Sequence, residues 1–144
     1  MKRALSDGYE IDDDRSRVDL AVVHQFLAGE AYWVPGRSFA TIERLVAEST
    51  RVIGTYAQDG AQAGFARVVS DRSSFAWLGD VFVLSEHRGR GLGAELVREA
   101  VEHEPECDCV WYLNTRDAHA LYARFGFRPA DPERTMTRQR ATRG

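Results

Sequence analysis

The sequence predicts a mixed α/β fold in which a central, mostly antiparallel sheet is flanked by helices. Two apolar runs, residues 51–57 and 63–70, are separated by the turn sequence QDGAQ, as in a β-hairpin. Farther along, a strand, an amphipathic helix and a second apolar run follow one another in the order of a βαβ unit. The chain has 144 residues, so we expect one domain that spans residues 1–144.

The segment before the hairpin is expected to hold one weak edge strand and two short helices. Residues 9–18 are the strand candidate, and residues 20–28 and 38–47 are the helix candidates. The connection at residues 29–38 contains glycine and proline, which is typical of a loop.

A third long strand is predicted at residues 75–84, directly after the hairpin. Gly79 and Asp80 interrupt its run of apolar side chains. Because an interior glycine in a strand commonly marks a bulge, we expect this strand to be irregular near these two residues.

The clearest helix begins near Gly91 and ends before Pro105. Residues 109–113 are almost all apolar, which predicts a strand covered on both faces. A further helix is expected at residues 118–126, followed by a closing strand at residues 127–138. The apolar face of the first of these helices consists of Leu92, Leu96, Val97, Ala100 and Val101.

Composition excludes several classes of protein. The net charge is −3, which opposes general attraction to nucleic acid or to an anionic membrane. The sequence has no apolar run long enough to span a bilayer, and no secretory leader is recognisable, so we expect a cytoplasmic protein. Only two cysteines occur, Cys107 and Cys109, which are too few for a structural zinc site and awkwardly spaced for a disulfide. We therefore expect no metal.

The stretch HRGRGLGAEL, residues 87–96, has the character of an anion-binding loop. It follows a strand and opens a helix, whose first turn leaves backbone N–H groups without partners inside the helix. Its glycines let the backbone approach a bulky phosphate, and Arg88 and Arg90 add positive charge. A pyrophosphate cradle is the leading interpretation.

Other interpretations of this loop fit less well. Gly89, Gly91 and Ala94 match a dinucleotide fingerprint. That fingerprint requires an acidic residue after the second strand, whereas Asp108 comes before the second strand here. No lysine follows the glycines, which excludes a Walker loop. An RGG-type nucleic-acid segment would be repeated and disordered. A loop that merely turns the chain stays possible.

Two motifs together resemble the GCN5-related N-acetyltransferases, the GNAT family. Residues 88–93, RGRGLG, match the family's acyl-CoA signature [Q/R]-x-x-G-x-[G/A], although Ser85 replaces the usual proline before it. About 25 residues downstream, the stretch LNTRDAHALYARFGF, residues 113–127, is similar to the family's second motif. The predicted order of elements also agrees with the family over most of the chain.

This resemblance implies an enzyme that binds acetyl-CoA as cosubstrate. The pyrophosphate would lie on the backbone amides of residues 88–94. The pantetheine arm would pair with the backbone of residues 81–83, which is exposed because a bulge near residues 79–80 separates this strand from the one at residues 109–113. Asn114 would hydrogen-bond the arm. The implied donor-binding residues are Val81, Phe82, Val83, Arg88, Gly89, Arg90, Gly91, Leu92, Gly93, Ala94 and Asn114.

The implied chemistry is attack of a neutral amine on the thioester carbonyl. By its position, the Val83 N–H is expected to stabilise the charge on the carbonyl oxygen. The resemblance assigns Tyr122 as the acid that protonates the departing sulfur, although it also lies on an apolar helix face that suits a core residue. Asp80 is the first candidate for the base, because a charge that interrupts an apolar strand needs a reason; a capped bulge residue is the alternative.

Weaker candidates for the base are His119 and Glu30. By resemblance, the loop at residues 29–38 lies over the acceptor site, where Tyr32, Trp33 and Arg37 either shape the site or pack the loop down. The acceptor is an amine on a small molecule or on a protein, with a possible homodimer and with no nucleic-acid or membrane partner. An acyl-CoA sensor without turnover is the alternative function.

Overall fold

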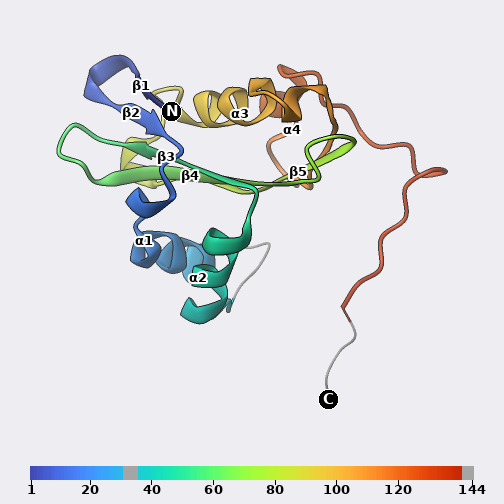
Figure 1. Cartoon of the computed structure of the whole chain (residues 1–144), viewed down its shortest axis with the longest axis horizontal. Helices are drawn as coiled ribbons and strands as arrows, with labels where there is room; N and C mark the ends of the chain where they lie inside the picture. The colour runs from blue at the N-terminus through green and yellow to red at the C-terminus, as the bar shows by residue number, and fades with distance from the viewer. Residues whose placement is uncertain (31–35, 141–144) are drawn as a thin grey trace.

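One six-stranded sheet, with its strands in chain order, forms the centre of the molecule (Figure 1). The computed structural model describes residues 1–30 and 36–140, and of Glu30 only the backbone. Strands β1 to β5 pair antiparallel, and β6 pairs parallel to β5. The strands are β1 Lys2–Ala4, β2 Glu10–Asp12, β3 Arg51–Tyr56, β4 Gln62–Ser70, β5 Phe75–Val83 and β6 Val110–Tyr112.

Helices cover both faces of this sheet (Figure 1). Helices α1, Leu20–Gln25, and α2, Phe39–Glu48, lie on one face, and a π-helical turn at Phe26–Glu30 extends α1. Helices α3, Leu92–Glu102, and α4, His119–Ala123, lie on the other. Each face has its own hydrophobic cluster: Leu96 and Val97 of α3 belong to one, Ile42 and Val46 of α2 to the other.

Strand β5 carries the bulge that Gly79 and Asp80 predicted. In the register with β4, Phe65 pairs with Phe82 and Arg67 with Gly79, so one β4 residue faces two β5 residues. Asp80 takes a left-handed backbone conformation, with φ of +53°. Leu78 and Val81 consequently pack against the same cluster although they are three residues apart, whereas an unbroken strand would place them on opposite faces.

Beyond the bulge, β5 and β6 part. The parallel pairing covers only three residue pairs, from Phe75 with Val110 to Trp77 with Tyr112. From Leu78 to Val83, β5 has no strand partner on its β6 side among the described residues. The sheet is therefore open between these two strands, which is the separation that the resemblance implied.

Two features of the sheet edges contradict the predictions. The strand at residues 109–113 is covered on one face only, because Val110 and Tyr112 are 60% and 38% exposed, while Trp111 and Leu113 pack inward. The predicted closing strand at residues 127–138 is wrong: the described residues 127–140 contain no strand, and this segment leaves the body of the protein (Figure 1). Pro129 and Pro132 have no backbone N–H to donate to a ladder.

The N-terminal prediction is also partly wrong. Of the strand expected at residues 9–18, only β2 forms, and it is preceded by β1, which the sequence pattern did not indicate. In the rest of that segment the chain forms a short 3-10 turn at Arg15–Arg17. The Asp14 side chain accepts from Ser16 N and caps this turn. None of the helices described for the chain has the length and apolar character needed to cross a bilayer.

Candidate active site

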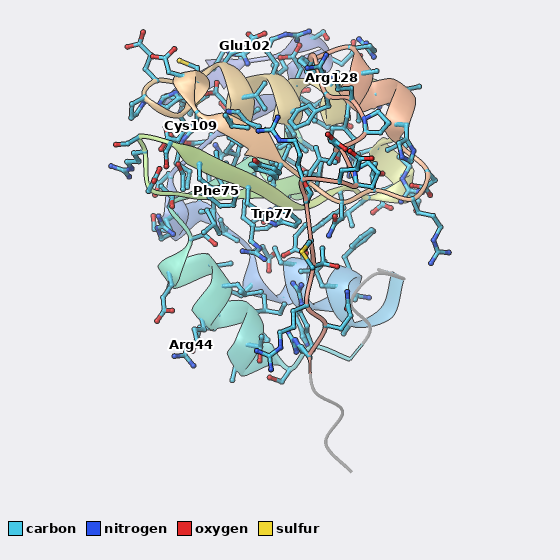
Figure 2. The ribbon with its side chains drawn as sticks, turned by 90° about the vertical axis from the view of Figure 1, so that its right-hand side faces the viewer. Arg44, Phe75, Trp77, Glu102, Cys109 and Arg128 are labelled. Atoms are coloured by element: carbon cyan, nitrogen blue, oxygen red, sulfur yellow. The ribbon has the colours of Figure 1, made fainter. Side chains whose placement is uncertain are left out.

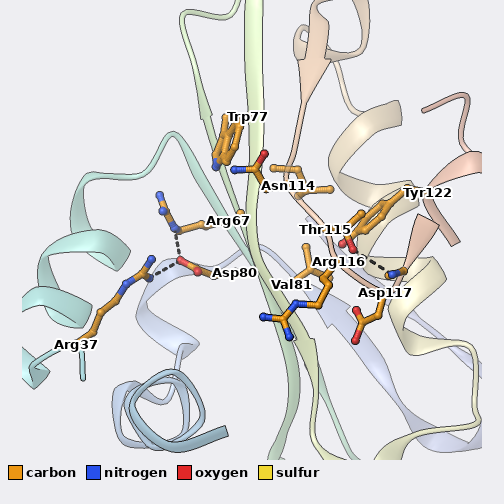
Figure 3. A pocket seen from close by; sticks show the side chains of 13 residues that line it. Arg37, Arg67, Trp77, Asp80, Val81, Asn114, Thr115, Arg116, Asp117 and Tyr122 are labelled. Carbon is orange, nitrogen blue, oxygen red and sulfur yellow. Dashed lines mark hydrogen bonds and ion pairs between the residues drawn. The ribbon is translucent and has the colours of Figure 1, made fainter. Parts of the chain in front are cut away.

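A cavity of about 460 Å³ lies at the opening between β5 and β6 (Figure 3). The β5 bulge forms one wall, and the loop after β6 forms another. Arg37 borders the cavity on the side of α1 and α2, and Tyr122 borders it on the side of α3 and α4. The lining consists of Arg37, Arg67, Trp77, Leu78, Gly79, Asp80, Val81, Asn114, Thr115, Arg116, Asp117, Ala118 and Tyr122.

Asp80 is the most tightly held charge in this cavity. Its Oδ2 accepts from Arg67 Nε at 2.6 Å and from Arg37 Nη1 at 2.8 Å, and its side chain is 3% exposed. Burial by itself raises the pKa of Asp80, but the charges and hydrogen bonds of Arg67 and Arg37 outweigh burial and hold this pKa below its ordinary value of 3.8. Asp80 is therefore a charged carboxylate at neutral pH.

Tyr122 enters the cavity from α4. Just before this helix, Thr115 Oγ1 accepts from Ala118 N at 3.0 Å, which fixes the turn that leads into α4. The Tyr122 ring is 9% exposed and meets Phe127 edge to face, with ring centroids 5.8 Å apart. The side chain belongs to the core cluster and also lines the cavity, so its place in the core is confirmed and its role as an acid stays a prediction.

The glycine loop lies beside the cavity and forms the start of α3. Gly89 and Gly91 have φ of +81° and +78°, values that glycine adopts without strain. A Cβ added at either residue would meet no atom within 4 Å, so the space in front of the loop is open. No side chain among the described residues caps α3, which leaves its first-turn amides available to an anion.

The two arginines of the loop are held by the protein itself. Arg88 Nε donates to Val83 O at 2.9 Å. Arg90 Nη1 forms an ion pair with Asp7 Oδ2 at 3.6 Å. Leu84 N donates to Ala63 O on β4, so Val83 turns its own N–H and C=O away from β4, toward the opening. The Val83 N–H therefore has the direction that an extra strand-like ligand needs, while the Val83 carbonyl accepts from Arg88.

The structure separates the predicted site residues into groups. Asp80, Val81 and Asn114 line the cavity with Tyr122. Phe82 points to the opposite face, where it stacks on Phe26 with ring centroids 4.1 Å apart, so only its backbone can serve a ligand. The loop residues Arg90, Gly91 and Leu92 border a second hollow of about 300 Å³, together with Arg3, Ala4, Leu5, Ser6 and Glu95.

Other predictions fall outside the cavity. His119 lies exposed on α4 and is not in the lining. Tyr32, Trp33 and the Glu30 side chain lie outside the described residues. Arg37, from the same predicted loop, does line the cavity.

The sequence pattern missed Arg67 and Trp77. Arg67 interrupts the apolar β4 strand just as Asp80 interrupts β5, so the same signal would have found it. Trp77 carried no such signal, because an aromatic residue in a strand usually indicates core.

The described residues offer no set of three side chains suited to a metal ion, and Cys107 and Cys109 are free thiols. Burial raises the pKa of Cys107, and Asp108 and Glu104 raise it further, so this thiol is not activated.

Comparison with known proteins agrees with this geometry. The sequence profile of the acetyltransferase (GNAT) family matches residues 13–127. The chain belongs to the GNAT family. A solved GNAT-family protein of Xanthomonas campestris is 39% identical, with a TM-score of 0.83 over 91% of this chain and 92% of that one. The resemblance and the fold class predicted from the two motifs are thus confirmed.

Two curated relatives match over shorter stretches. A mycothiol acetyltransferase of Nocardia farcinica is 36% identical over 85 residues, which are 58% of this chain and 28% of that protein. A Gibberella zeae protein named as an acetyltransferase is 30% identical over 74 residues, 49% of this chain and 42% of that protein. The match thus covers less than half of the length of either relative. The GNAT membership and these names support an acyltransferase.

Proposed function

We propose that this GNAT protein transfers an acetyl group from acetyl-CoA to a primary amine, by direct attack within a ternary complex. The observation that carries this proposal is the opening between β5 and β6, which is bordered by Tyr122 on one side and by Arg37 on the other (Figure 3). A donor and an acceptor that approach from opposite faces of the sheet would meet in it.

The donor side is supported by backbone rather than side-chain groups. The open space in front of Gly89 and Gly91 and the uncapped start of α3 suit a pyrophosphate on the amides of residues 88–94. The unpartnered β6 side of β5 suits the amides of a pantetheine arm along residues 81–83, with Asn114 at the far wall.

The transfer forms an amide bond between the amine nitrogen and the acetyl carbon, and breaks the bond between that carbon and the CoA sulfur. The Val83 N–H would stabilise the negative charge that develops on the carbonyl oxygen. Tyr122 would give its hydroxyl proton to the departing sulfur, and the amine would lose a proton to a base or to solvent. Tyr122 then regains a proton from solvent.

Asp80 stays a predicted base, and the salt bridges bear on that role. A carboxylate whose pKa lies below its ordinary value is ionised at neutral pH but accepts a proton less readily than an unpaired one. Its contacts with Arg37 and Arg67 favour a second role, that of positioning these two side chains.

Thermal unfolding in the presence of CoA and acetyl-CoA tests donor binding. We expect both to raise the midpoint temperature of the wild type, and Gly91→Asp to abolish that shift, because a carboxylate would face the pyrophosphate. Gly60→Asp is the matched control, since Gly60 also has positive φ, +91°, but lies in the turn between β3 and β4. No shift with the wild type at millimolar ligand would overturn the cradle.

Release of free CoA thiol across a panel of amines tests turnover. Thiol release that depends on both acetyl-CoA and an amine supports the enzyme. Binding of acetyl-CoA without thiol release from any amine supports the alternative, a sensor or regulatory module with the same fold.

A further inference from the structure

The geometry points to an acceptor amine that carries its own anionic group, a carboxylate or a phosphate, which Arg37 and Arg67 bind. This inference rests on the proposed function, because it names the class of amine that enters the acceptor side of the same cavity. Three features of the cavity wall carry it: its charge, the arrangement of its N–H donors, and the close approach of Arg67 and Trp77 at Gly79.

The charge of the cavity is opposite in sign to that of the chain. The protein has a net charge of −3, yet the described lining holds three arginines and two aspartates. Arg37, Arg67 and Asp80 form a compact group with one positive charge in excess. A cavity with a positive net charge, in a protein whose net charge is negative, is a suitable environment for an anion.

Both guanidinium groups direct a single N–H to the same carboxylate oxygen. Arg67 uses Nε and Arg37 uses Nη1, and both contact Oδ2 of Asp80. Each guanidinium has five N–H donors in a fixed plane, so one bond to Asp80 orients the group and leaves donors for a second anion. The side chains of Arg67 and Arg37 are 14% and 17% exposed, and both line the cavity, so a ligand in it can reach their remaining donors.

The side chains of Arg67 and Trp77 pack closely against Gly79, which has no Cβ to hold them apart. A Cβ added at Gly79 would lie 3.1 Å from Trp77 Nε1 and 3.5 Å from Arg67 Cζ, closer than ordinary contact for the first of these. Two kinds of N–H group, a guanidinium and an indole, thus lie close together in the cavity lining, because residue 79 has no side chain between them (Figure 3).

The position of this group fits an acceptor. Arg37 and Arg67 lie on the α2 side of the opening, and Tyr122 lies across it (Figure 3). A small molecule held by its anionic end at the arginines would extend its amine toward the side where Tyr122 meets the departing sulfur. Asp80 is then a positioning residue, because it acts through the arginines.

Calorimetric titration with inorganic phosphate and with acetate tests the subsite directly. The protein is first saturated with CoA, so that the glycine loop cannot take the probe. We expect phosphate, acetate or both to bind the wild type in the millimolar range, and binding in Arg37→Ala to be about ten- to a hundredfold weaker. Arg67→Lys, which keeps the charge but not the planar fork, is the second variant and is expected to weaken binding as well.

Arg44→Ala is the matched control. Arg44 lies on α2 with its side chain 76% exposed and paired with Glu48, away from the cavity (Figure 2). Its variant should bind phosphate as the wild type does. Failure of both probes to bind the wild type up to about 50 mM, or equal binding by wild type and Arg37→Ala, would overturn the inference.

Matched amines then identify the anion. β-Alanine is compared with β-alaninamide for the carboxylate, and O-phosphoethanolamine with ethanolamine for the phosphate. We expect kcat/KM for the anionic member of one pair to exceed that of its neutral partner by at least about tenfold, and this ratio to fall toward one in Arg37→Ala. Equal rates within both pairs would overturn it.

Failure of the inference and failure of the proposed function give different results. If CoA neither binds nor is released with any amine, the proposed function fails. Phosphate binding at Arg37 and Arg67 can then still be measured by titration of the CoA-free Gly91→Asp protein. If neutral amines are acetylated as fast as anionic ones, the enzyme stands and the anionic acceptor does not.

Discussion

Replacement of Asp80 by asparagine isolates the charge that holds Arg37 and Arg67 in place. Asparagine has the same size and also tolerates the left-handed conformation that residue 80 adopts, with φ of +53°. The backbone and the bulge are therefore retained, and only the negative charge is lost.

The expected loss of stability follows from the burial of the three charges. The Asp80 side chain is 3% exposed, and those of Arg67 and Arg37 are 14% and 17% exposed. Removing one partner of a buried ion pair typically destabilises a protein by about 3–5 kcal/mol, and the asparagine oxygen retains part of the hydrogen bonding, so we expect about 2–3 kcal/mol.

Urea unfolding followed by tryptophan fluorescence measures this change. With a slope of about 2 kcal/mol per molar urea, the unfolding midpoint of Asp80→Asn should fall by about 1–1.5 M at neutral pH. The slope should stay the same, because the variant buries the same surface.

The difference should depend on pH in a definite direction. The folded-state pKa of Asp80 lies below its ordinary value of 3.8, so the stabilisation is fully present above pH 5 and is lost as pH falls through the folded pKa. The midpoints of wild type and Asp80→Asn should therefore converge on acidification.

Asp59→Asn is the control for a general effect of charge removal. Asp59 lies exposed in the β3–β4 turn, where its Oδ1 accepts from Ala61 N, a bond that asparagine can keep. Equal midpoints for wild type and Asp80→Asn at neutral pH, or a gap that does not narrow in acid, would refute the reasoning.

Three further predictions concern the catalytic acid, a helix cap and assembly. Tyr122→Phe should lower kcat by roughly 10²–10⁴ and leave the KM for acetyl-CoA unchanged, as steady-state thiol release will show; unchanged turnover would make Tyr122 a core residue only. Ser38→Ala should destabilise the protein by about 1 kcal/mol in urea, since Ser38 Oγ accepts from Thr41 N at 3.2 Å to cap α2; an unchanged midpoint would refute the cap. We expect a homodimer that uses the β6 edge, where Val110 is 60% exposed, and Val110→Lys should make it monomeric by light scattering; a monomeric wild type would contradict this.

The sequence predicts those parts of the fold that local patterns control. The hairpin β3–β4, helix α3 and the bulge in β5 each depend on residues close together in the chain, and the structure has all of them. Gly79 and Asp80 marked the bulge because an interior glycine and a charge are both unfavourable in a regular strand.

Features set by distant pairing could not be read in this way. β1 has three exposed residues and no apolar pattern, so it exists as a strand only because β2 lies beside it. Whether residues 127–138 form a strand likewise depends on pairing with β6 and not on the local pattern alone, and the structure has no strand there. Pro129 and Pro132 are local residues that oppose a strand in this segment.

The arginine group shows the same limit within the site. Arg37 is 43 residues from Asp80, and Arg67 is 13 residues from it, so no spacing rule connects the three. The sequence identified Asp80 as a charge that needed a reason, and identified the loop that contains Arg37. Only the fold shows that these are parts of one cluster with Arg67.

Asp80 is the extra residue of the β5 bulge, and the pairing of β4 with β5 would be regular if Asp80 were absent. Residues on either side of the bulge keep the alternation of an ordinary strand once residue 80 is left out, because Ala66 would then face Val81 alone. A chain with this single codon deleted should fold with Leu78, Val81 and Phe82 on their present faces. It would lose the carboxylate that orients both arginines. One inserted residue is thus enough to convert the regular pairing of β4 and β5 into a bulge that carries a carboxylate, and the deletion variant tests this by reversing it.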